Sequence, residues 1–223
     1  CGAMNPEACD IDLDKAVPIA VASRFGNGGQ TCIAAKRFIL TPGIADAFIG
    51  RFVAAASQLQ VGDPALETTT LAPMVRPDAR AELQRQVDAS LAAGAVLLLG
   101  GRPGDGPCEY PATILDHVVP GVPAYSEELF GPVASIIRAA DANDAIRIAN
   151  DTAFGLAASI WTEDKTKGEA LARKIQAGAV FINALVRSDV RLPFGGTKTS
   201  GFGRELAEHG IHEFMNIKTV YVD

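Results

Sequence analysis

The sequence predicts an α/β protein with a mostly parallel sheet that is flanked by helices on both faces. Two observations carry this prediction. Short apolar segments alternate with longer segments of helical periodicity along most of the 223 residues. Several apolar segments, such as PVASIIRA (132–139), lack the polar–apolar alternation of a half-exposed strand, which is typical of strands buried on both faces. A repeated strand–helix–strand order then requires crossover connections and parallel pairing.

The first helix is expected over residues 10–25, with Asp10 or Asp12 as its N-cap. One helical stripe of this segment carries four apolar side chains: Leu13, Val17, Val21 and Phe25. Pro18 lies inside the segment, where it costs on the order of 3 kcal/mol unless the helix bends. The segment is therefore predicted as a helix that contains an unfavourable proline.

The remaining elements follow from the same patterns. In the first half, the sequence predicts a glycine-rich loop over 26–32, a strand over 36–41, a helix over 43–59, a helix over 77–93 and a buried strand over 95–101. After a Pro- and Gly-rich loop over 102–111, it predicts strands over 132–139, 156–162 and 179–184, and helices over 142–151 and 164–178, the last one ended by glycine.

The tail MNIKTVYVD (215–223) differs from the other strands because its polar and apolar residues alternate. We expect it to be a strand that leaves the domain and pairs elsewhere. The predicted organisation is thus one domain over residues 1–214 and a separate C-terminal strand over 215–223.

Composition excludes several classes of protein. The formal net charge is −6 and no basic run occurs, so a nucleic-acid partner is not expected. No apolar stretch approaches the about 18–20 uncharged residues of a membrane helix, and the N-terminus has no signal-peptide pattern, so no membrane partner is expected. The four cysteines share no C-x-x-C spacing and only three histidines accompany them. The sequence therefore predicts neither a metal site nor a disulfide framework, and it favours a cytoplasmic location.

Cys32 is the first candidate for chemistry. It ends the segment GNGGQTC (26–32), whose glycines leave the sulfur reachable and place the main-chain N–H of Cys32 where an oxyanion can be held. The alternative is a buried structural cysteine. The loop lacks the Lys-Ser/Thr pair of a phosphate-binding P-loop. A cysteine hydrolase would need a histidine partner, and the sequence connects none of its three with this thiol: His117, His209 and His212.

A second candidate is the acidic pair in YSEELFGP (125–132). Glu127 and Glu128 are either solvated carboxylates at a turn or a group that holds sugar hydroxyls, as acidic residues do for ribose in nicotinamide enzymes. Phe130, two residues further on, offers a flat apolar face to a planar ring.

Three segments together resemble one family. FGNGGQTC with Cys32, EELFGP with Glu128 and Phe130, and PFGGTKTSGFGRE from Pro193 are similar to the aldehyde dehydrogenase superfamily, in the family's order and over essentially the whole chain. The resemblance implies that Cys32 attacks an aldehyde carbon to give a thiohemiacetal. It further implies that hydride passes to NAD or NADP, and that water hydrolyses the resulting thioester. Glu128 would hold the nicotinamide ribose and Phe130 would pack near the nicotinamide.

The regions 12–36 and 203–220 are most similar to the bacterial succinate-semialdehyde dehydrogenase branch. By this resemblance Ser188 helps bind the distal carboxylate of a small aldehyde, and Arg187 or Arg191 adds positive charge. The chain departs from some enzymes of the branch, which have an arginine where Gly26 stands. Lys36 and Arg37 are expected to begin the next strand without a catalytic role.

The resemblance implies that residues 1–214 are the catalytic domain of such an enzyme and that 215–223 belong to its oligomerisation region. It also implies what the sequence lacks. Full members are about twice as long, and CGAMNP (1–6) aligns with the residues that directly follow the family's general base. We therefore expect this chain alone to be a poor or inactive dehydrogenase that does not bind NAD or NADP by itself, although its parent is a homodimer or homotetramer acting on a small aldehyde. The alternative is a catalytically silent domain that self-associates through its tail strand.

Overall fold

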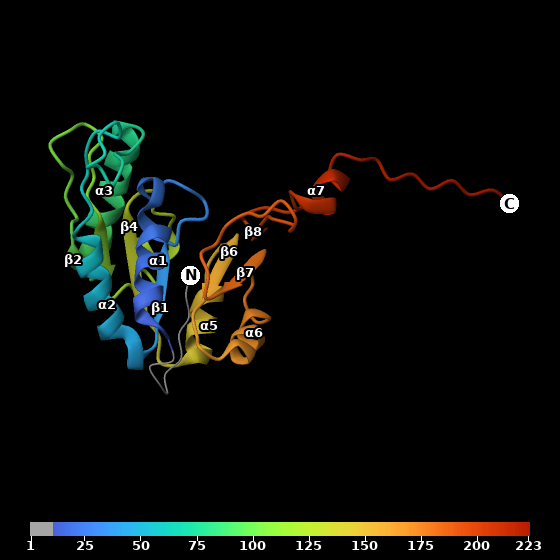
Figure 1. Cartoon of the computed structure of the whole chain (residues 1–223), viewed down its shortest axis with the longest axis horizontal. Coiled ribbons are helices and arrows are strands. Elements are labelled where there is room, and N and C mark those ends of the chain that lie inside the picture. The colour runs from blue at the N-terminus through green and yellow to red at the C-terminus, as the bar shows by residue number, and fades with distance from the viewer. Residues whose placement is uncertain (1–10) are drawn as a thin grey trace.

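A computed structural model describes residues 11–223 and confirms the α/β class. Its main sheet has the strand order β1-β4-β3-β2 (Figure 1). β1 (Arg37–Leu40), β4 (Val133–Arg138) and β3 (Thr113–Asp116) are parallel neighbours, while β2 (Val96–Leu99) pairs antiparallel with β3 at the edge. The sheet is mostly parallel, as the sequence predicted.

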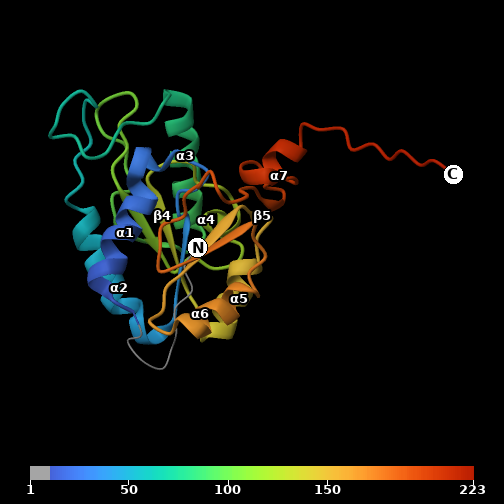
Figure 2. The same ribbon diagram turned by 45° about the vertical axis from the view of Figure 1, so that its right-hand side comes forward.

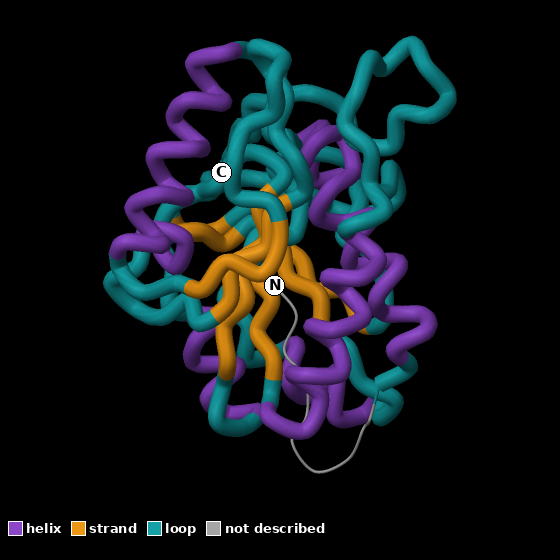
Figure 3. The backbone as a smooth tube through the Cα atoms, turned by 90° about the vertical axis from the view of Figure 1, so that its left-hand side faces the viewer, coloured by secondary structure: helices purple, strands orange, loops and turns teal. Residues whose placement is uncertain are grey.

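Helices cover both faces of this sheet, and Figure 3 shows the strands between them. One face packs on α1 (Leu13–Phe25) and α2 (Pro42–Ala56), and the other on α3 (Pro77–Ala92), α4 (Pro123–Ser126) and α5 (Ala142–Asn150). Side chains of β1 alternate between these two cores: Phe38 and Leu40 belong to the first and Ile39 to the second. Burial on both faces explains the continuous apolar run of this strand.

The remaining strands form two small separate sheets. β6 (Ala157–Ile160) and β7 (Ala179–Ile182) are parallel and are joined through α6 (Lys165–Ala172). β5 (Phe154–Gly155) pairs antiparallel with β8 (Thr197–Lys198). Among the described strands, no pairing joins β6 to β1. The described strands thus form three sheets, and an apolar cavity lies between β1 and β6.

Two other local predictions need correction. The strand predicted as buried over 95–101 is the edge strand β2, where Val96 is 45% exposed and Leu97 is 39% exposed. A short apolar run does not distinguish an edge strand from a central one. The helix predicted over 164–178 ends at Ala172. Gly178 does not cap it but allows close approach of the Gly195 backbone, whose carbonyl oxygen a side chain at 178 would overlap.

The first helix agrees with its prediction. α1 starts after Asp12, whose carboxylate accepts a hydrogen bond from the Lys15 N–H at 3.1 Å, while the alternative cap Asp10 lies outside the described residues. The helix continues through Pro18. Packing of its buried face against the first core offsets the missing hydrogen bond.

The C-terminal segment follows α7 (Ala207–His212) and extends away from the body of the molecule (Figure 2). Residues 215–223 form no strand in this chain, and their apolar side chains are open to solvent, Ile217 at 86% and Tyr221 at 82%. The predicted strand is thus not paired within the chain. Pairing with another subunit, and the division at residue 214, stay predictions.

Candidate active site

The loop that carries Cys32 begins with a tight reversal at the end of α1. The 3₁₀ turn η1 (Gly26–Gly29) contains three residues with positive φ, among them Gly29 at 69°. A side chain at Gly29 would overlap the carbonyl oxygen of Gly131, so the loop can lie against that segment only with glycine at this position. The reversal leads to Cys32, which is a free and exposed thiol. The alternative of a buried structural cysteine is therefore wrong.

Arg24 holds this loop in place from the last turn of α1. Its guanidinium is fully buried and donates to the carbonyl oxygens of Gly29 at 2.7 Å, Gly131 at 2.8 Å and Ala35 at 3.1 Å. Burial lowers the pKa of Arg24 to about 9, and the charge of Glu128 opposes this shift. The side chain thus keeps its charge and its donors at neutral pH. It fixes the loop that carries Cys32 (residues 26–32, the Cys32 loop) to the segment before β4.

Lys36 connects the Cys32 loop with the acidic pair. Its ammonium lies 3.0 Å from Glu128 Oε1 and 5.7 Å from the centre of the Phe130 ring. Burial lowers the pKa of Lys36, and the nearby charge of Arg24 adds to this, whereas Glu128 and Cys32 act in the opposite direction. The structure therefore brings Cys32, Glu128 and Phe130, predicted from two separate sequence segments, around one ammonium group to which the sequence analysis assigned no role.

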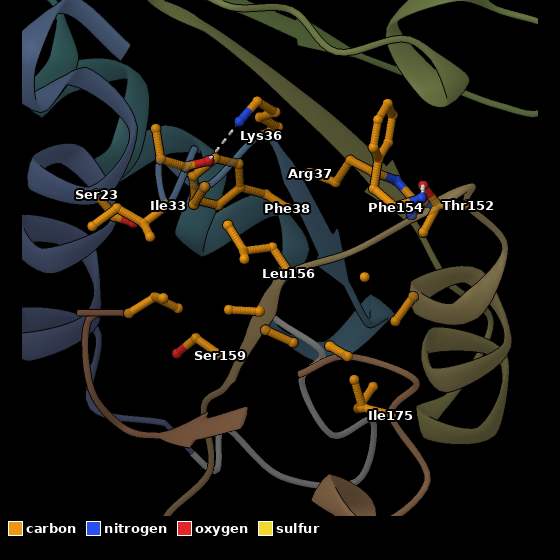
Figure 4. A pocket seen from close by; sticks show the side chains of 18 of the residues that line it. Ser23, Ile33, Lys36, Arg37, Phe38, Thr152, Phe154, Leu156, Ser159 and Ile175 are labelled. Atoms are coloured by element: carbon orange, nitrogen blue, oxygen red, sulfur yellow. Dashed lines mark hydrogen bonds between the residues drawn. The ribbon is translucent and has the colours of Figure 1, made fainter. Parts of the chain in front are cut away.

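A cavity of about 460 Å³ opens beside the thiol. Its lining includes Cys32, Lys36 and Glu128, and the rest of the wall is mostly apolar, from α1, β1, β6 and the segment after β7. Figure 4 shows Lys36 at one end, with Phe38 and Leu156 around the interior. No histidine is among the described residues that line this cavity, so no partner for a cysteine hydrolase is present there. An exposed thiol beside an apolar cavity suits attack on a small organic substrate.

The three residues expected to bind the substrate lie on the loop after β7. Ser188, Arg187 and Arg191 are all exposed, and none of them lines the cavity. Arg191 forms a two-point ion pair with Asp189, with Nε–Oδ1 at 2.9 Å and Nη2–Oδ2 at 2.7 Å. This pair lowers the pKa of Asp189 and leaves Arg187 as the arginine of the loop whose charge is not engaged in that way.

Residues 11–223 contain neither a group of metal-binding side chains nor a membrane-spanning helix. In this part of the chain, no three His, Cys, Asp or Glu side chains are grouped so that they could bind a metal ion. Within the same residues, every helix is too short or too polar for a membrane crossing.

Fold and site together define an α/β domain that presents an exposed thiol at an apolar cavity, next to a carboxylate and an aromatic ring. The chain belongs to the aldehyde dehydrogenase family, whose model matches residues 8–220.

Individual relatives agree with this assignment. The chain is 53% identical to succinate semialdehyde dehydrogenase [NAD(P)+] Sad of Escherichia coli (strain K12) over 96% of its own length, and 51% identical to succinate-semialdehyde dehydrogenase [NADP(+)] 1 of Mycobacterium ulcerans (strain Agy99) over 95%. It spans 46% of the length of each. Among solved structures, the succinic semialdehyde dehydrogenase of Streptococcus pyogenes in complex with NADP+ superimposes with a TM-score of 0.92 at 35% identity, covering 99% of this chain and 49% of that one.

Proposed function

We propose that this chain carries the catalytic thiol of an enzyme that oxidises a small aldehyde with an acidic tail, such as succinate semialdehyde, to the carboxylate with NAD or NADP. The observation that carries the proposal is the exposed Cys32 at the cavity that also contains Glu128. The relatives named as succinate-semialdehyde dehydrogenases support the substrate class.

The chemistry follows from the thiol. The Cys32 thiolate adds to the aldehyde carbon, an S–C bond forms, and the carbonyl oxygen becomes an alkoxide that the main-chain N–H of Cys32 stabilises. When bound, NAD or NADP supplies the hydride acceptor that makes this thiohemiacetal a thioester. Water then attacks the thioester carbon and the S–C bond breaks, with one proton of the water going to the sulfur and the other to solvent as the carboxylate is released. The mostly apolar wall of the cavity favours the uncharged aldehyde group near the sulfur.

The residues present fit part of a nicotinamide cofactor. The Glu128 side chain is 41% exposed and only one of its oxygens is paired with Lys36, so the carboxylate can accept hydrogen bonds from ribose hydroxyls. Phe130 is 44% exposed, so its ring would be available to pack against a nicotinamide. By itself the chain is expected to bind NAD and NADP weakly or not at all, because these two residues would hold only one end of the dinucleotide.

The test uses the chain alone and a chimera in which residues 11–220 replace the matching part of the Escherichia coli relative. Calorimetric titration with NAD and NADP measures binding, and absorbance of the reduced cofactor measures oxidation of succinate semialdehyde. We expect the chimera to bind the cofactor and to oxidise succinate semialdehyde. A folded chimera that binds NADP but oxidises no small aldehyde contradicts the proposal. If, in addition, sedimentation shows self-association of the chain through residues 215–223, the alternative of a catalytically silent domain is favoured.

Substitution of the loop arginines tests the substrate class. In the chimera, Arg187→Gln is expected to raise KM for succinate semialdehyde about tenfold with little change in kcat, because one exposed charge-assisted hydrogen bond to the distal carboxylate is lost. Arg191→Gln is the matched control, and its effect should be under about threefold because Arg191 already pairs with Asp189. The same measurement with an uncharged aldehyde of similar size is the second control. If Arg187→Gln raises KM for that aldehyde as much as for succinate semialdehyde, or if Arg191→Gln has the same effect as Arg187→Gln, recognition of the carboxylate by Arg187 is contradicted.

A further inference from the structure

A partly buried cation, Lys36, lies between the Cys32 loop and the acidic pair, and the proposed chemistry does not use it. We propose that Lys36 is a positioning residue for Cys32, and that its ammonium, held by Glu128, stabilises the negative charge of the sulfur before attack. The proposal rests on the function proposed above and adds a residue to it.

The backbone and the side chain of Lys36 are both fixed. Its carbonyl oxygen accepts a hydrogen bond from the Ser135 N–H at 3.0 Å, which holds the residue against β4 at the start of β1. Its side chain is only 19% exposed. The ammonium lies 3.5 Å from the carbonyl oxygens of Thr31, Cys32 and Ala34, so it sits directly under the turn that presents the thiol.

Groups from three other segments of the chain lie around the Lys36 ammonium. Arg24 of α1, the carboxylate of Glu128 and the Cys32 residue surround the ammonium, whereas the neighbouring Glu127 accepts a hydrogen bond from Gln86 of α3 at 2.9 Å. Cys32 is among the groups that favour the charged form of Lys36. The ammonium also lies 3.5 Å from the main-chain carbonyl oxygen of Cys32, so a thiolate formed at this residue would lie close to a cation. Glu128 competes with Cys32 for the same ammonium.

This competition predicts opposite effects of two substitutions. Lys36→Met removes the charge and keeps the apolar stem, so the thiolate form of Cys32 should become rarer. Glu128→Gln removes the competing anion, so the thiolate should become more common. Lys36→Arg keeps a cation at the site and should restore most of the original behaviour.

The experiment measures the rate of Cys32 alkylation by iodoacetamide between pH 5 and 10 in the 223-residue chain, with each labelled cysteine resolved by peptide mass spectrometry. Iodoacetamide is uncharged, so the rate reports the thiolate fraction rather than attraction of the reagent. We expect Lys36→Met to move the midpoint to higher pH and to slow alkylation at pH 7 roughly three- to tenfold. Glu128→Gln should move the midpoint to lower pH. Cys108, half-buried elsewhere, is the internal reference and should not change.

Two outcomes would overturn the proposal. One is an unchanged Cys32 profile in a folded Lys36→Met chain. The other is a shift of the same sign for Lys36→Met and Glu128→Gln, which would indicate a disturbed loop rather than a charge effect. If Lys36→Met does not fold, the sign of the Glu128→Gln shift decides, and a shift to higher pH or no shift rejects the role. No aldehyde or cofactor is involved, so failure of the proposed enzymatic function would be seen separately, in the turnover assay.

Discussion

Cys32→Ser is expected to lower aldehyde oxidation by the chimera at least about 10³-fold, because a serine hydroxyl without a thiolate's nucleophilicity replaces the atom that forms the covalent intermediate. The cofactor should bind as before, with a dissociation constant within about twofold, since Cys32 is not among the residues assigned to ribose or nicotinamide. The readouts are absorbance of the reduced cofactor for turnover and calorimetry for binding.

Cys108→Ser is the matched control for this experiment. Cys108 is the other described free thiol, it is partly buried, and it packs against the core on the α3 side of the sheet rather than at the cavity. Its substitution should leave turnover within about twofold, as for a change away from the site. Retention of more than about a tenth of the activity by Cys32→Ser would show that another group performs the attack, and the proposed function would then need a different nucleophile.

The sequence was sufficient for the fold class because strands buried on both faces leave a direct trace in it. β4 and β1 consist mainly of apolar residues without polar–apolar alternation, and the helices between strands have clear periodicity. β3, a central strand of only four residues, was missed because Pro111 and the glycine-rich loop before it favour an irregular segment. The edge position of β2 was also not predictable, since neighbours in a sheet are decided by contacts distant in sequence.

The same distinction applies to the site. Cys32 could be found because its neighbours in sequence, three glycines and a threonine, already describe a reachable thiol. Arg24 could not be found, because the carbonyl oxygen of Gly131 that it binds lies 107 residues away in the sequence. The role of Lys36 could not be found either, because its partner Glu128 belongs to a loop distant in sequence. The position of Lys36 in the sequence indicates only the start of a strand. Residues that support a site through long-range contacts leave no local pattern.

Gly29→Ala is expected to destabilise the chain by about 3 kcal/mol or more, the largest stability effect that the loop offers. The backbone at Gly29 has a φ of 69°, a conformation that costs an alanine on the order of 1 kcal/mol. The added methyl group would also overlap the carbonyl oxygen of Gly131 and the Nη2 atom of Arg24. These atoms hydrogen bond to each other at 2.8 Å, so relief of the overlap in either direction disrupts the buried contact.

Gly26→Ala, three residues earlier in the same turn, is the control that separates this effect from a general sensitivity of glycine. Gly26 has a φ of −55°, and no atom lies within 4 Å of the place where its Cβ would stand. Its free energy of unfolding should change by less than about 0.5 kcal/mol, or rise slightly because alanine restricts the unfolded chain. Urea unfolding followed by circular dichroism measures both variants. Equal destabilisation by the two substitutions would mean that the stability of the turn does not depend on the contact between Gly29 and Gly131. Arg24 alone would then hold the Cys32 loop against the sheet.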